Sequence, residues 1–136
     1  MSMQINPYVI FDGRCREAFT TYAQCLGGTV NFSTYGEMPG GVQQPDQSPD
    51  HIMHARLEAH GAVLMGSDGP GGDGPKDSVW VSVTLHDTGE AERIFAALAE
   101  GGSVVMPLAE TFWAPRFGML KDRFGLSWMI NCERAA

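Results

Sequence analysis

Residues 79–105 read VWVSVTLHDTGEAERIFAALAEGGSVV, and their pattern decides the fold. Up to Leu85, aliphatic residues alternate with polar or aromatic ones, as in a strand that buries one face. The next apolar residues recur at the spacing of one buried helix stripe: Ala91, Ile94, Phe95 and Leu98. Gly101-Gly102 suits a left-handed helix end, and Ser103-Val104-Val105 follows it. The stretch therefore predicts a strand, a helix over about 90–100 and a second strand.

The same order of elements occurs earlier, where residues 8–30 read YVIFDGRCREAFTTYAQCLGGTV. A helix over about 14–26 is expected there, with Ala18, Tyr22 and Cys25 as its buried stripe. Glu17-Ala18 matches Glu90-Ala91, and one glycine pair matches the other. The chain therefore contains one unit twice.

Each helix is followed by about three more strand-like segments, at 29–35, 51–59 and 62–65 and at 103–106, 116–121 and 127–132. The sequence thus predicts an α+β protein of two βαβββ modules, about 3–66 and about 78–133, within one domain spanning 1–136. The stretches 36–50 and 66–78 are rich in glycine and proline, so we expect them to be irregular.

Alternation separates the two faces of each strand. In the third strand one side carries Met53, Ala55, Leu57 and Ala59, and the other carries His54, Arg56, Glu58 and His60. In the first strand of the second module, Val79, Val81, Val83 and Leu85 oppose Trp80, Ser82, Thr84 and His86. One face of each sheet should pack on its helix, and the other is either solvated or lines a cavity.

Composition excludes several classes of protein. The 136 residues include 9 basic and 16 acidic ones, for a net charge of -7, and the basic residues form no run, which argues against nucleic acid as a partner. No apolar run approaches the about 18 residues of a membrane-spanning helix. Cys15, Cys25 and Cys132 form no CxxC pair, and no signal segment is evident at the start, so we expect a cytoplasmic protein.

Polar motifs suggest little chemistry. Residues 69–74 are glycine-rich but lack the sequence of a phosphate-binding loop. His51 and His54 are three residues apart, so on a regular strand they point to opposite faces and could share a metal only across a bend. Ser67-Asp68 before the glycine-rich stretch is typical of a turn, and no GxSxG motif accompanies it.

Aromatic residues concentrate near the end of the chain. Phe112, Trp113, Phe117 and Trp128 could form a rigid apolar wall for a small organic ligand. They could equally form a small core at one end of the sheets. His54, on the polar side of its strand, is a further candidate for lining a cavity.

Several segments together resemble the PhnB-like branch of the vicinal oxygen chelate superfamily, which includes glyoxalase I, bleomycin-resistance proteins and extradiol dioxygenases. The resemblance covers nearly the whole chain. It rests on Asn6-Pro7-Tyr8, Gly36-Glu37-Met38-Pro39, His54-Ala55, Met65-Gly66-Ser67-Asp68, Thr111-Phe112-Trp113 and Asp122-x-x-Gly125-x-x-Trp128-Met129-Ile130.

This resemblance implies mixed sheets that curl around a cavity, commonly completed in a homodimer. Metal-dependent superfamily members carry His or Glu ligands on the first and last strands of the modules. Here the matching late position is Met129, and the early positions around Tyr8 and Trp80 are not ligands either. These departures from the superfamily pattern argue against its usual metal site, and we expect neither a metal nor a cofactor. Relatives are often labelled as similar to a 3-demethylubiquinone methyltransferase, but neither module starts with a glycine-rich turn for a nucleotide-like cofactor.

Three hypotheses follow. The first is a homodimeric protein that binds a small hydrophobic or aromatic molecule without a metal, in a cavity lined by His54, Trp80, Trp113, Phe117 and Trp128. The second is a metal-dependent lyase or oxygenase with unusual ligands such as His54, His51 or Asp68. The third is a scaffold that binds a protein through residues 36–50. No residue stands out as a general base, so catalytic residues stay unassigned.

Overall fold

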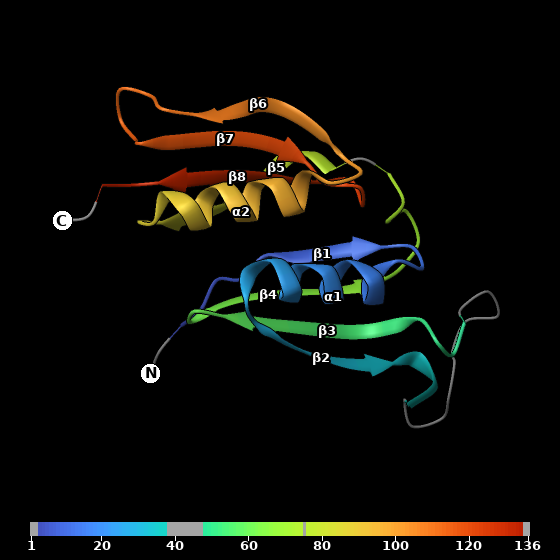
Figure 1. The fold of residues 1–136 in the computed structure, drawn as a ribbon. Coiled ribbons are helices and arrows are strands. Elements are labelled where there is room, and N and C mark those ends of the chain that lie inside the picture. Colours follow the sequence, from blue (N-terminus) through green and yellow to red (C-terminus); the bar gives the residue numbers. More distant parts are fainter. Residues whose placement is uncertain (1–2, 38–47, 75, 135–136) are drawn as a thin grey trace. The chain divides into compact units, whose positions relative to one another are not determined.

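The structure, a computed structural model, describes residues 3–37, 48–74 and 76–134. The chain divides into two compact units, Met1–Asp73 and Gly74–Ala136. In both, one helix lies along one face of a four-stranded sheet (Figure 1).

The first unit contains β1 (Tyr8–Phe11), α1 (Cys15–Leu26), β2 (Thr29–Thr34), a 3-10 turn (Tyr35–Glu37), β3 (Ile52–Ala59) and β4 (Ala62–Asp68). Its strands lie in the order β1-β4-β3-β2. β1 runs parallel to β4, while β2 and β4 run antiparallel to β3.

The second unit repeats this plan with β5 (Lys76–Leu85), α2 (Thr88–Ala99), β6 (Ser103–Ala109), β7 (Arg116–Lys121) and β8 (Leu126–Cys132). Its strand order is β5-β8-β7-β6, with β5 parallel to β8 and the other pairs antiparallel. The predicted α+β fold of two βαβββ modules is confirmed, and each module forms a mixed sheet.

The predicted helix stripes are the buried faces of both helices. Ala18, Tyr22 and Cys25 are buried on α1, joined by Cys15 and Phe19. The buried residues of α2 are those expected: Ala91, Ile94, Phe95 and Leu98. Gly27 ends α1 at φ 74°, and Gly101 takes φ 77° just beyond α2. Each glycine pair therefore supplies the left-handed residue that stops its helix.

The prediction that 66–78 is irregular throughout was wrong at both ends. β4 continues to Asp68 because residues 66–68 pair with β1, with Phe11 opposite Asp68. β5 begins at Lys76, opposite Leu126, and a register shift follows before Trp80. This shift explains why Val79 is 67% exposed instead of sharing the buried side of Val81.

A second irregularity lies near the start of β3. The register between β2 and β3 shifts where Ser33 pairs with His54 but Thr34 pairs with Ile52, so Met53 is the extra residue. Ile52 is therefore 1% exposed, whereas Met53, expected on the buried side, is only partly buried.

The expected variable loop at 36–50 falls largely on residues 38–47, which lie outside the described residues. Among the described helices, none has the length and apolar character to span a membrane.

Candidate functional site

Each sheet has one face that packs on its helix and one that does not, which we call the open face. In the second unit, a Cβ on Gly118 would lie 2.7 Å from the Phe95 ring of α2, so Gly118 marks the helix side of β7. Ile130 is opposite Gly118, and Trp128 is opposite both Leu120 and Val81. Because neighbouring residues alternate, the open face carries Trp80, Ser82 and Thr84 on β5, Phe117, Met119 and Lys121 on β7, and Ser127, Met129 and Asn131 on β8.

An aromatic group stands where β6 leads into β7. The ring centroids of Trp113 and Phe117 are 5.3 Å apart, and those of Phe112 and Trp113 are 4.8 Å apart, both edge to face. Trp113 is 50% exposed and Phe112 is 94% exposed. Neighbouring exposed aromatic rings make this end of the sheet a candidate binding surface.

The turn that presents these rings is held by Thr111. Its backbone N–H donates to the Ala114 carbonyl at 2.9 Å, and its hydroxyl oxygen accepts the Ala114 N–H at 3.1 Å. Ala114 is fully buried. The two residues between them, Phe112 and Trp113, are therefore turned outward on a fixed backbone.

The predicted aromatic set is only partly brought together. Trp80 and Phe117 share the open face, and Trp113 contacts Phe117. Trp128 lies on the opposite, helix-facing side and is 1% exposed. The structure thus places Trp128 in the core of its unit, and it places Trp80, opposite Ser127, four residues along β8 from the Asn131 position that Phe117 faces.

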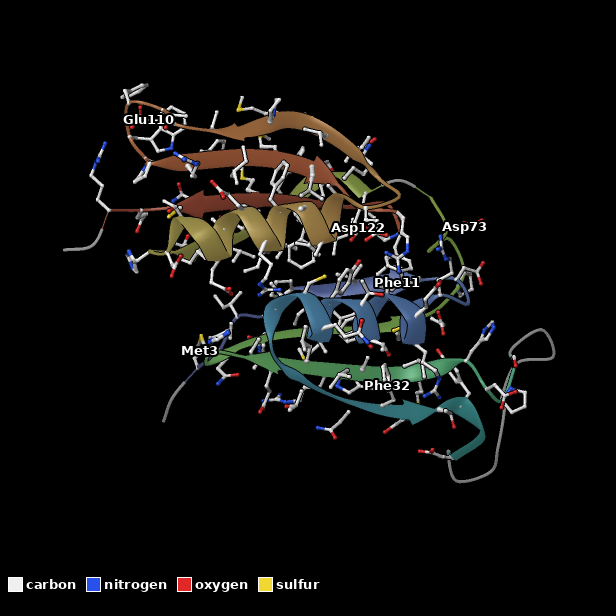
Figure 2. The ribbon with its side chains drawn as sticks, viewed as in Figure 1. Met3, Phe11, Phe32, Asp73, Glu110 and Asp122 are labelled. Atoms are coloured by element: carbon white, nitrogen blue, oxygen red, sulfur yellow. The ribbon has the colours of Figure 1, made fainter. Side chains whose placement is uncertain are left out.

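Trp128 has a structural partner in Asp122, the buried residue at the β7–β8 turn marked in Figure 2. The Trp128 indole N–H donates to Asp122 Oδ2 at 2.8 Å. The backbone N–H groups of Phe124 and Leu126 donate to Asp122 Oδ1 at 2.8 and 3.1 Å. The D-x-x-G turn of the sequence is therefore a hydrogen-bonded unit that fixes the hairpin and the indole together.

His54 belongs to the first unit, on the open face of its sheet. Its ring lies 5.9 Å from that of Tyr8, which is 47% exposed on β1. The neighbouring cation on that face, Arg56, is paired with Glu58 at 2.8 Å. The pair Tyr8 and His54 therefore offers an aromatic surface with polar atoms at its edge.

Asp68, one of the candidate metal ligands, uses both carboxylate oxygens to accept hydrogen bonds from backbone N–H groups. It is 2% exposed, and its Oδ1 accepts the N–H groups of Gly13 at 2.8 Å and Cys15 at 3.0 Å. Its Oδ2 accepts the N–H of Ile52 at 2.9 Å. The carboxylate caps the start of α1, where Arg14 stands at the N-cap position and supplies no side-chain cap. Using it as a metal ligand would uncap the helix.

The donor set for a metal is poor on both open faces. Pro7-Tyr8, Trp80-Val81 and Met129 stand at the positions where the resemblance stated above implies metal ligands, and they supply no imidazole or carboxylate. Within residues 3–37, 48–74 and 76–134, no three His, Cys, Asp or Glu side chains gather as a metal-binding group. The residues present therefore do not fit the metal that the resemblance to vicinal oxygen chelate proteins implies.

Two groups near Asp68 have raised pKa values. Burial, and secondly the Asp68 carboxylate, raise the pKa of the Cys15 thiol from 9.0 to about 12, opposed by Arg16. Burial, and then the neighbouring Tyr8, raise the pKa of Tyr35, whose hydroxyl donates to the Asp68 carbonyl at 2.9 Å. Cys15 is thus a neutral thiol at physiological pH and a poor nucleophile.

Sequence reasoning missed Asn131. It follows Met129 by two residues and so shares the open face, opposite Thr84 on β5 and Phe117 on β7. Its side-chain oxygen is buried without a hydrogen-bond partner in the described part of the chain. No pattern distinguishes this asparagine in the sequence, because its environment depends on the register of three strands.

The sequence profile of a protein family described as 3-demethylubiquinone-9 3-methyltransferase matches residues 3–131. Protein YjdN of Escherichia coli (strain K12) is 34% identical over 142 residues, which cover 95% of either chain. The crystal structure of protein PA1353 from Pseudomonas aeruginosa is 48% identical, with a TM-score of 0.88, and the match covers 98% of this chain and 100% of that one.

Two solved structures with lower identity share the fold. One is a putative 3-demethylubiquinone-9 3-methyltransferase, PhnB protein, from Bacillus cereus, with a TM-score of 0.74, 24% identity and coverage of 96% and 99%. The other is a glyoxylase/bleomycin resistance protein/dioxygenase domain from Frankia sp. EAN1pec, with a TM-score of 0.64, 12% identity and coverage of 98% and 99%. The predicted resemblance to PhnB-like proteins on the glyoxalase fold is confirmed.

Proposed function

The chain belongs to the 3-demethylubiquinone-9 3-methyltransferase family, and from that premise we propose that it binds a small hydrophobic or aromatic molecule on the open faces of its sheets, without a metal. The observation that carries the proposal is the ring contact between Trp113, half-exposed on a fixed turn, and Phe117, half-buried at the start of β7. Rigid aromatic side chains bind apolar ligands at low cost in side-chain entropy, because they have few rotatable bonds.

Trp80 on the same sheet face and His54 on the open face of the first unit complete the proposed binding residues. Trp128 supports the site indirectly, because its indole and the Asp122 carboxylate fix the strands that carry Phe117 and Met129. His54 adds an imidazole whose two nitrogens can donate to or accept from a polar group of the ligand.

We propose binding and not methyl transfer, despite the family's name. The turn between β1 and α1, residues 12–14, and the turn between β5 and α2, residues 86–87, lack the glycine-rich sequence that brings a backbone close to a nucleotide-like cofactor. The family's name alone suggests methyl transfer, and the residues of these two turns give it no support.

We also propose that the protein is a cytoplasmic homodimer. Edge strand β6 supports the dimer, because Val104, Val105 and Met106 are all exposed on it. Apolar residues on an exposed edge strand favour pairing with another chain.

The test is a titration of chelator-treated protein with a library of small hydrophobic compounds, followed by tryptophan fluorescence and melting temperature. We expect some compounds to raise the melting temperature by several degrees and to change the fluorescence. Trp113→Phe should lose most of that fluorescence change. Trp128→Phe, the matched control, should melt at a lower temperature but still bind, because Trp128 is a core residue.

A library that changes neither signal contradicts the proposal. Elemental analysis of protein purified without chelators tests the alternative of a metal-dependent lyase or oxygenase. Stoichiometric zinc, nickel, manganese or iron, with ligand binding lost on chelation, would favour that enzyme.

A further inference from the structure

Asn131, at an open-face position of β8, has a side-chain oxygen without a hydrogen-bond donor, and a ligand would reach this oxygen only by displacing the atoms that cover it. Its Oδ1 is buried, and no donor reaches it from any residue that the structure describes. Its Nδ2 donates to Glu133 Oε2 at 3.4 Å. Because a carboxylate only accepts hydrogen bonds, this long, exposed contact is consistent with the nitrogen on the Glu133 side of the amide and Oδ1 on the other side.

An acceptor of this kind is uncommon, because most buried polar side-chain atoms in proteins have at least one partner. Leaving one unpaired lowers stability, so an unpaired acceptor on a candidate binding face points to a donor that arrives with a ligand. Polar groups of this kind fix the orientation of a ligand in an otherwise apolar site.

The surroundings of Asn131 fit such a ligand. Across β7 its register partner is Phe117, whose ring contacts Trp113. Across β5 its partner is Thr84, a small residue that is exposed. The acceptor and the two aromatic rings therefore belong to one side of one sheet, within one unit of the chain.

We propose that the small molecule of the proposed function, on which this inference rests, carries an N–H or O–H donor that Asn131 Oδ1 accepts while its flat apolar body packs against Phe117 and Trp113. The ligand class is thus an aromatic or heteroaromatic compound with a hydrogen-bond donor, such as an indole, a phenol or an aromatic amide. Compounds that present only an acceptor at that point are rejected, because two acceptors would face each other.

The experiment uses indole and 1-methylindole as probes, since they share a flat ring system and differ in one N–H donor. Isothermal titration of the full chain should show indole binding about 3- to 10-fold more tightly, the range that one neutral hydrogen bond contributes. Asn131→Leu, which removes the acceptor at similar size, should bind both compounds equally. Asn131→Asp keeps an oxygen acceptor and should keep the preference for indole.

The matched control is Gln24→Leu, at an exposed position of α1 away from the open faces, which should leave the preference unchanged. Melting temperature provides a second readout. Because Asn131→Leu removes a buried acceptor that has no donor, it should melt at or above the temperature of the natural chain. A purely structural asparagine would instead lower it.

Equal affinities of the natural chain for the two probes, or a preference that survives in Asn131→Leu, would overturn this inference and leave the proposed function standing. A melting temperature that falls in Asn131→Leu would overturn it as well. If neither probe nor any compound of the wider library binds, the proposed function fails and this inference fails with it.

Discussion

Single residues in this protein hold the fold more often than they offer chemistry. Asp68 and Asp122 are both buried carboxylates, and each accepts three hydrogen bonds from its own unit. From the sequence, Asp68 is a plausible metal ligand or part of a turn, because a carboxylate before a glycine-rich stretch is compatible with both. Only the positions of Gly13, Cys15 and Ile52 around it decide between them, and these come from distant parts of the chain.

Replacing Asp68 with asparagine should lower the free energy of unfolding by about 2–3 kcal/mol. The amide nitrogen would replace one carboxylate oxygen, so two donors would face each other where a backbone N–H, such as that of Ile52, now donates to the carboxylate. Urea unfolding measures this loss. Asp12→Asn, at an exposed position of the same turn, should change stability by less than about 0.5 kcal/mol. Equal effects of the two substitutions would mean that Asp68 does not cap α1.

The Cys15 thiol predicts a dependence of stability on pH. Its pKa is about 12 in the folded chain and 9.0 in an ordinary environment, so the unfolded chain loses this proton first. Below pH 9 the thiol is protonated in both states, so Cys15 makes its full contribution to stability there. Between pH 9 and 12 the free energy of unfolding falls, by at most about 1.4 kcal/mol per pH unit, because only the unfolded chain loses the proton. Urea unfolding of Cys15→Ala should show a shallower fall over that window and a parallel curve below pH 9.

At the scale of elements, the sequence predicts most of what the structure shows. The helix stripes are clear because period and burial agree, and the glycine pairs mark both helix ends. The ends of β4 and β5 were mispredicted because their glycine-rich surroundings look like a loop, although pairing with β1 and β8 extends both strands. The faces of Trp80 and Trp128 also depend on pairing, so aromatic density alone could not separate the half-buried open-face residue from the core residue.

Close packing of α1 on its sheet depends on Gly66. A Cβ there would lie 2.5 Å from the Val9 carbonyl oxygen and 2.8 Å from the Phe19 ring. Gly66→Ala should therefore cost about 3 kcal/mol of stability, since backbone and a buried ring must both move. Gly61→Ala is the control, because it has φ 83° and open space, and should cost only about 1 kcal/mol. Thermal unfolding compares the two, and a smaller loss for Gly66→Ala would contradict this packing.

Edge strand β6 carries the prediction for the homodimer. Val105→Lys places a charge on the exposed apolar edge and should convert a dimer to a monomer. Light scattering after size-exclusion chromatography measures the mass. Ala96→Lys, at an exposed position of α2, should leave the dimer intact. A mass that stays dimeric in Val105→Lys would place the interface elsewhere.

At the scale of the whole molecule, an internal repeat explains the architecture. Both halves of the chain have the same element order and the same strand order, as the doubled sequence pattern predicts. The two units differ in how they start their helices: Asp87 caps α2 from the N-cap position, whereas α1 is capped by Asp68 of β4. The pairing of the modules around a cavity, within a chain or across a dimer, stays a prediction.

The central claim is that an open sheet face, without a metal, binds a small aromatic molecule. The three tryptophans test it directly, because each gives one indole N–H signal in a ¹⁵N-edited NMR spectrum. During titration of chelator-treated protein with indole, the signals of Trp113 and Trp80 should shift in proportion to saturation, while that of Trp128, hydrogen-bonded to Asp122 in the core, should stay in place. A shift confined to Trp128, or no shift of Trp113 with indole or any other compound of the library, would contradict the account.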